Sequence, residues 1–120
     1  MSTDFIKKLR KNYQTSYDAM RLKENISNLA EQFISEKLLE KSSELENYYS
    51  FPLHELSKYK NISRYTKKTN DFSEHGAFFK AVHNIIDNFC KENDLNYEYT
   101  IDSESQEVDV TISYATKHKK

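Results

Sequence analysis

A short basic segment with interleaved tyrosines holds the residue types in this sequence that are best suited to binding chemistry. Residues 58–68 contain five positive side chains, no negative one and two tyrosines. The candidate residues are Lys58, Tyr59, Lys60, Arg64, Tyr65, Lys67 and Lys68. Lys and Arg neutralise phosphates, and a Tyr ring can stack on an unpaired base. The segment is therefore a candidate nucleic-acid site, with a solvated loop and a contact with an acidic protein surface as the open alternatives.

Motifs of catalysis are missing from the sequence. The single glycine, Gly76, excludes the common phosphate-cradling loops, which need several glycines. There is no nucleophile elbow, no paired-cysteine motif and no zincin motif. The 19 carboxylates form many accidental pairs, so a pair of acids indicates nothing by itself. We therefore predict a protein that is not an enzyme, with no cofactor and no small-molecule substrate.

Potential metal ligands and the one thiol are better explained by structure. His83 and Asp87 lie four residues apart, and His75 lies two helical turns before His83. Zinc sites use three or four ligands, often at tighter spacing, so we expect no metal site here. Cys90 falls on an apolar stripe, where a free cysteine behaves as a small buried hydrophobe.

The elements that would position these residues begin with a β-hairpin near the end of the sequence. Residues 95–101 and 108–114 alternate strictly between apolar and polar side chains, which is typical of half-buried strands. Pairing Asp102 with Glu107 places Ile101 opposite Val108 and keeps both apolar faces together. The other face is acidic, which suits either solvent or a basic partner. Open strand edges could pair with a second copy or with a partner strand.

The rest of the chain favours helices. Residues 3–13 are amphipathic, with Phe5, Ile6, Leu9 and Tyr13 on one side, and residues 16–49 contain neither glycine nor proline. Whether residues 3–49 form one helix or two stays open, and a coiled coil is an alternative to a straight helix on a small core.

Two further helices follow in the prediction. A short one begins at Pro52 with Leu53 and Leu56 inward, and residues 61–72 are expected to form a loop. Ser73 is expected to cap an apolar helix over 74–93, which would cover the hairpin. The predicted fold is thus α+β and mostly helical, with three to four helices and a C-terminal antiparallel hairpin.

Composition indicates one domain over residues 1–120, with a flexible basic tail at 117–120. Apolar residues make up 37%, below the usual share of roughly 45–50%, so the core depends on seven Phe and nine Tyr. A core this thin leaves room for a protein partner or a second copy. The sequence has no apolar run long enough for a membrane span and no secretory signal, and its single cysteine fits the cytoplasm.

These observations favour a small protein that acts by binding another protein, as a regulator, inhibitor, immunity or assembly factor. Fifteen Lys against three Arg is typical of an AT-rich genome, such as that of a phage, a plasmid or a low-GC bacterium. Nucleic-acid binding through residues 58–68 is the alternative function.

Overall fold

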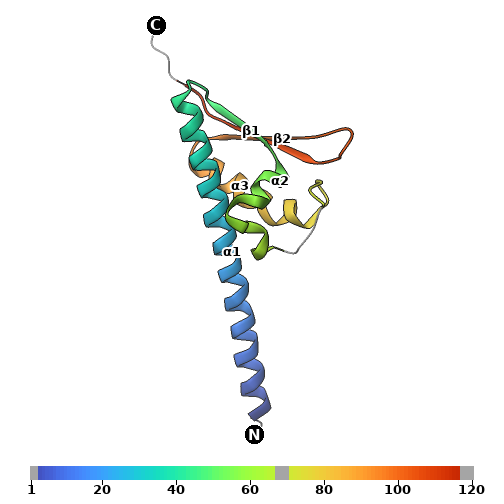
Figure 1. Ribbon diagram of the computed structural model, residues 1–120. Coiled ribbons are helices and arrows are strands. Elements are labelled where there is room, and N and C mark those ends of the chain that lie inside the picture. The colour runs from blue at the N-terminus through green and yellow to red at the C-terminus, as the bar shows by residue number, and fades with distance from the viewer. Residues whose placement is uncertain (1–2, 67–70, 117–120) are drawn as a thin grey trace.

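One long helix organises the molecule, and a small body packs on one half of it (Figure 1). The computed structural model describes residues 3–66 and 71–116. Helix α1 runs over Thr3–Ser43, so the N-terminal region forms one helix rather than two. The molecule measures 76 × 37 × 21 Å, with a radius of gyration of 18.3 Å. A compact chain of this length would have a radius of gyration of about 14 Å. The larger value found here reflects the half of α1 that extends beyond the body.

The sheet has three antiparallel strands in the order β1-β3-β2. They are β1 (Tyr48–Pro52), β2 (Asn96–Ile101) and β3 (Val108–Ser113). Strands β2 and β3 form the predicted hairpin in the predicted register, with Ile101 opposite Val108. The Asp102 amide donates to the Glu107 carbonyl at 2.9 Å and closes the turn as expected.

Strand β1 was not predicted, because the sequence pattern continues helix to residue 49. The structure ends α1 at Ser43 and turns the chain back as a strand that pairs with β3, Phe51 opposite Val110. The turn is a Schellman motif: the Glu46 amide donates to the Lys41 carbonyl at 2.9 Å, and the Leu45 amide to the Ser42 carbonyl at 3.1 Å. Leu45 occupies the left-handed position of this motif, with φ of 65°.

Three short or medium helical segments complete the body: α2 (Leu53–Lys58), the 3₁₀ segment η1 (Tyr59–Tyr65) and α3 (Ala77–Glu92). Leu53 and Leu56 are buried, as predicted. Segment η1 replaces the first part of the expected loop, because Ile62 is buried in the core and η1 packs against α1 and α2. Helix α3 begins after Gly76, three residues later than expected, with Gly76 rather than Ser73 at its N-cap.

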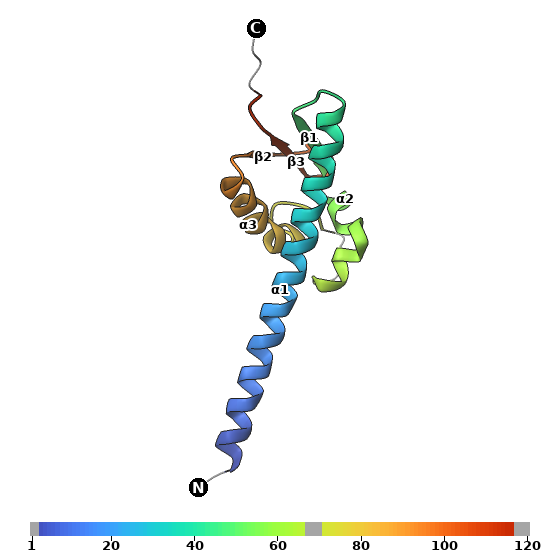
Figure 2. The ribbon, with the colours of Figure 1, turned by 90° about the vertical axis from the view of Figure 1, so that its left-hand side faces the viewer.

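The core lies between the second half of α1, the inner face of the sheet and α3. In the view of Figure 2, α3 lies on one side of α1 and α2 on the other. Buried side chains of α1 are Ile26, Ala30, Phe33 and Ile34, and those of β3 are Val108, Val110 and Ile112. The protein is therefore an α+β fold, in which a hairpin, one further strand and α3 all depend on the same half of α1.

Candidate functional site

The basic segment lies on η1 and the end of α2, on the surface of the body. Lys58, Lys60 and Arg64 are exposed, as phosphate binding would require. Lys67 and Lys68, the other two predicted cations, lie outside the described residues. The structure thus brings three of the five predicted cations onto one short stretch of surface.

Tyr59, one of the two predicted stacking residues, is held against α1. Its hydroxyl donates to Glu36 Oε2 at 2.8 Å, and its ring meets the edge of Phe33 with centroids 5.2 Å apart. Partial burial and the hydrogen bond to Glu36 raise the pKa of Tyr59 to about 12. This tyrosine therefore serves to attach η1 to α1.

The cations of the segment lie over its own aromatic rings. Lys60 Nζ is 5.4 Å from the centroid of Tyr59, and Arg64 Cζ is 4.7 Å from the centroid of Tyr65. Cation–π contacts of this length are attractive, so a base would have to displace the cation to stack on the ring face that the cation covers. The segment keeps its positive charge at the surface, but one face of each ring is already occupied.

Two acidic side chains of the hairpin, Glu107 and Asp102, are engaged within the molecule. Glu107 accepts a hydrogen bond from the His54 amide at 3.0 Å and also contacts the His54 ring. Asp102 accepts hydrogen bonds from the Ser105 and Glu104 amides, and the Ser105 bonds lower the pKa of this carboxyl. Burial and the neighbouring Glu107 raise the pKa of Asp109. Glu107 and Asp102 therefore stabilise α2 and the turn of the hairpin.

His83 and Cys90 belong to the packing of α3. His83 Nδ1 lies 2.8 Å from the Tyr97 hydroxyl, and its ring is 4.8 Å from that of Phe79. Burial raises the pKa of the Cys90 thiol to about 11. Among the described residues, no three His, Cys, Asp or Glu side chains gather as metal ligands.

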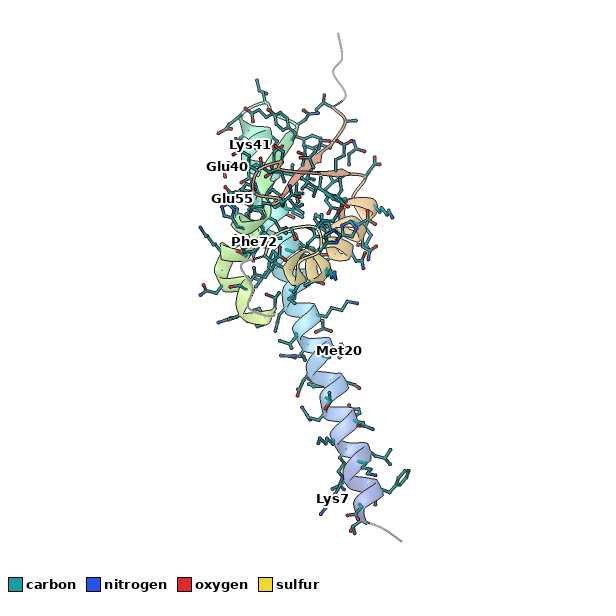
Figure 3. All side chains as sticks on the ribbon, turned by 90° about the vertical axis from the view of Figure 1, so that its right-hand side faces the viewer. Lys7, Met20, Glu40, Lys41, Glu55 and Phe72 are labelled. Atoms are coloured by element: carbon teal, nitrogen blue, oxygen red, sulfur yellow. The ribbon has the colours of Figure 1, made fainter. Side chains whose placement is uncertain are left out.

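The largest unexpected surface is the first half of α1, which we call the arm (residues 3–24). Every residue of the arm is exposed, whereas the first buried residue of the helix is Ile26. Figure 3 shows the arm extending away from the body, with Lys7 and Met20 on it. The arm carries an apolar row that we call the arm stripe: Ile6, Leu9, Tyr13, Tyr17 and Met20. Exposed fractions in this row range from 41% at Tyr17 to 73% at Tyr13.

The sequence showed the spacing of this stripe but not its exposure. An apolar row at intervals of three and four residues is also typical of a core-facing helix, and the two cases look the same in the sequence. What distinguishes them here is length, because the body spans only the second half of α1. The arm stripe is therefore the functional candidate that sequence reasoning missed.

The arm is also basic. Its six positive side chains, Lys7, Lys8, Arg10, Lys11, Arg21 and Lys23, outnumber three acidic ones, which leaves a net charge of +3. None of the salt bridges found in the described part of the chain uses a basic side chain of the arm. The arm thus combines an apolar row with positive charge on its flanks.

A groove lies at the opposite end of α1, where this helix meets α3 and the start of β2. Its volume is about 360 Å³, and we call it the α1–α3 groove. The lining residues are Ser35, Leu38, Leu39, Ser42, Phe89, Asn93, Leu95 and Tyr114. Leu39 is 69% exposed at its rim, so the groove presents apolar side chains to the outside.

The described helices include none that is long and apolar enough to cross a membrane. Comparison of the chain with models of known protein families, with curated proteins and with solved structures gave no match.

Proposed function

We propose that this protein is a small, non-enzymatic protein-binding factor, acting as a regulator, inhibitor, immunity or assembly protein, and that its arm is the binding element. The observation that supports this proposal is the arm stripe, an apolar row on a helix that extends beyond its own body. Contiguous exposed apolar surface on a soluble domain commonly marks a site of interaction.

The energetics of the arm favour a bound state. A helix gains little stability from propensity alone, and most of it comes from packing an apolar face. In the arm that face is exposed along its whole length. Burying an apolar side chain that is about half exposed gains on the order of 1 kcal/mol, so five of them supply roughly 5 kcal/mol before the cost of association. A helix laid along another protein surface is a common mode of recognition.

The test is site-specific photocrosslinking in the native host. A photoreactive residue at Tyr17 should form protein adducts, whereas the same residue at Thr15, on the other side of the arm, should form few. An adduct with a second copy of the chain and an adduct with a different protein both support the proposal. Equal labelling at the two positions, or no protein adduct at Tyr17, would contradict the proposal.

Nucleic-acid binding is a second candidate, supported by the exposed Lys58, Lys60 and Arg64. If it holds, binding to a labelled single strand falls steeply with salt, and Lys60→Glu with Lys67→Glu abolishes it. The control is Lys80→Glu with Lys91→Glu, which makes the same charge change on α3. Unchanged migration of DNA and RNA probes at low salt would exclude this function.

We place this activity in the cytoplasm as part of the proposal. The support is the single cysteine of the sequence, Cys90, which is buried in the core as a thiol. A chain of this kind has no internal disulfide to protect it in an oxidising compartment.

A further inference from the structure

We infer that the protein bound by the arm is a second copy of this chain, with the two α1 helices antiparallel and each arm lying on the partner's α1–α3 groove. The inference rests on the proposed function, because it requires the arm stripe to be a protein-binding surface. It names the partner and the complementary site, neither of which follows from an exposed stripe alone.

The stripe and the groove lie on the same side of α1. At about 3.6 residues per turn, Ile6, Tyr13 and Tyr17 point in nearly the same direction from the helix axis. Ser35, Leu38 and Ser42, three of the four α1 residues that line the groove, fall on that same side further along the helix. One face of α1 thus carries two apolar regions, one near each end.

Antiparallel pairing brings these two regions together twice. A two-fold interface joins the same patch on both chains, so that contact of residue i with residue j is repeated as j with i. If Ile6 of the first copy contacts Leu39 of the second copy, then symmetry also places Leu39 of the first copy against Ile6 of the second. Met20 then lies near Asn25 of the second copy, close to the symmetry axis. In this register Ile6 and Leu9 meet the groove of the second copy, and the rest of the stripe lies along its α1 nearer the symmetry axis.

Charge favours the antiparallel direction. The arm has a net charge of +3, whereas residues 25–46 have five acidic and two basic side chains and a net charge of −3. Both basic residues of that region, Lys37 and Lys41, already lie within 4.0 Å of glutamates. Antiparallel helices place a positive half against a negative half, whereas parallel helices place like charges together.

The stripe alone supplies a large part of the contact area that a stable dimer needs. Aromatic side chains bury on the order of 200 Å² each, so the half-exposed stripe offers roughly 500 Å² per chain. A standard interface buries roughly 800 Å² per partner. The stripe therefore supplies more than half of that area, and the groove and the exposed face of α1 add to it.

The first experiment measures mass in solution by sedimentation equilibrium at micromolar concentration. The full chain should have twice the 14.3 kDa mass of one chain. Tyr13→Lys with Met20→Lys should give the single-chain mass, because two ammonium groups then replace apolar side chains of the stripe inside the helix–helix contact. Thr15→Lys with Ala19→Lys adds the same charge off the stripe, is the matched control and should remain dimeric. Circular dichroism confirms that both variants keep the folded body.

The second experiment tests the direction of the helices by mixing two single-site variants, Ile6→Cys and Leu39→Cys. Oxidation of the mixture should link one variant to the other. Neither variant alone should form a linked pair efficiently, since two copies of residue 6 lie at opposite ends. The native Cys90 is buried and contributes no background. Efficient linkage of Ile6→Cys to itself would show parallel arms and overturn the inference.

The outcomes separate this inference from the proposed function. A monomer whose Tyr17 position crosslinks to a different protein keeps the proposed function and overturns the second-copy inference. A dimer that survives Tyr13→Lys with Met20→Lys points to pairing through a sheet edge and also overturns it. A monomer that floats with vesicles of anionic lipid, and forms no protein adduct, shows that the stripe binds a membrane surface and overturns both.

Discussion

Leu45 combines a left-handed backbone with a side chain that lies 95% in solvent. The left-handed conformation costs an L-residue roughly 1–2 kcal/mol, and glycine, which has no Cβ, avoids most of that cost. Glycine is the usual residue at this position of a Schellman motif. Its absence explains why the end of α1 at Ser43 could not be predicted from the sequence.

We expect Leu45→Gly to raise the free energy of unfolding by about 0.5–1 kcal/mol, because it removes the strain and loses little buried surface. Ser43→Gly is the control, since it places glycine in the last helical position and should lower stability by roughly 0.5 kcal/mol. Urea unfolding monitored by circular dichroism measures both. A loss of stability in Leu45→Gly would show that the side chain contributes contacts that outweigh its backbone.

Cys90 allows a prediction on pH. Burial, with a smaller effect of Asp87, raises the pKa of this thiol from 9.0 to about 11. The folded chain therefore keeps a proton that the unfolded chain releases, so this group makes stability fall as pH rises from about 9 to 11. The carbon-13 shift of labelled Cys90 Cβ should titrate near 11, and Cys90→Ala should lose this part of the pH dependence. A midpoint at 9 would contradict the buried position.

At the scale of elements, α2 receives its N-terminal cap from a distant strand. Pro52 precedes the helix and offers no side-chain hydrogen bond, whereas the Glu107 carboxylate, next to β3, accepts from the His54 amide at 3.0 Å. Caps of this kind satisfy a backbone donor and place negative charge at the positive end of the helix. Glu107 thus joins α2 to the hairpin.

We expect Glu107→Ala to lower the free energy of unfolding by about 1–2 kcal/mol, and Glu107→Gln to lower it by less because the amide oxygen still accepts. Glu104→Ala, an exposed carboxylate in the same turn, should change stability by under about 0.5 kcal/mol. Denaturant unfolding of the three variants distinguishes capping from general charge. Equal effects at residues 104 and 107 would exclude the capping role.

The hairpin and β1 show what the sequence could predict about elements. Strict alternation over 95–101 and 108–114 specifies both strands and their register, because a slip by one residue would expose the apolar face. Strand β1 has five residues, and only Tyr49 and Phe51 alternate inward. Such a short pattern directly after a helical one carries too little signal, and pairing with β3 decides its structure.

For the two candidate sites, the basic segment and the arm stripe, the sequence predicted less than it did for the hairpin. The basic segment was visible as composition, but the contacts of Tyr59 with Glu36 and Phe33 depend on tertiary structure. The arm stripe was visible as spacing, but its exposure depends on how far the body extends along α1. In both cases residue types could be recognised, and their surroundings could not.

At the scale of the whole molecule, the arm and the body are separable. No residue before Ile26 is buried among those that the structure describes, so removing residues 1–22 takes no side chain from the core. We expect the shortened chain to unfold cooperatively, with a free energy of unfolding within about 1 kcal/mol of that of the full-length monomer. It should also sediment as a monomer at every concentration. A shortened chain without a cooperative transition would show that the body needs the arm.

The order of the strands has a consequence for synthesis. Strands β1 and β2 pair only with β3, and β3 follows both of them in the chain. No part of this sheet can therefore form on the ribosome until residues 108–113 have emerged. Until then the apolar face of α1 has no sheet to cover it, and the nascent chain exposes both that face and the arm stripe. A slowed or stalled ribosome upstream of β3 would hold the protein in the state most prone to aggregation and most attractive to chaperones.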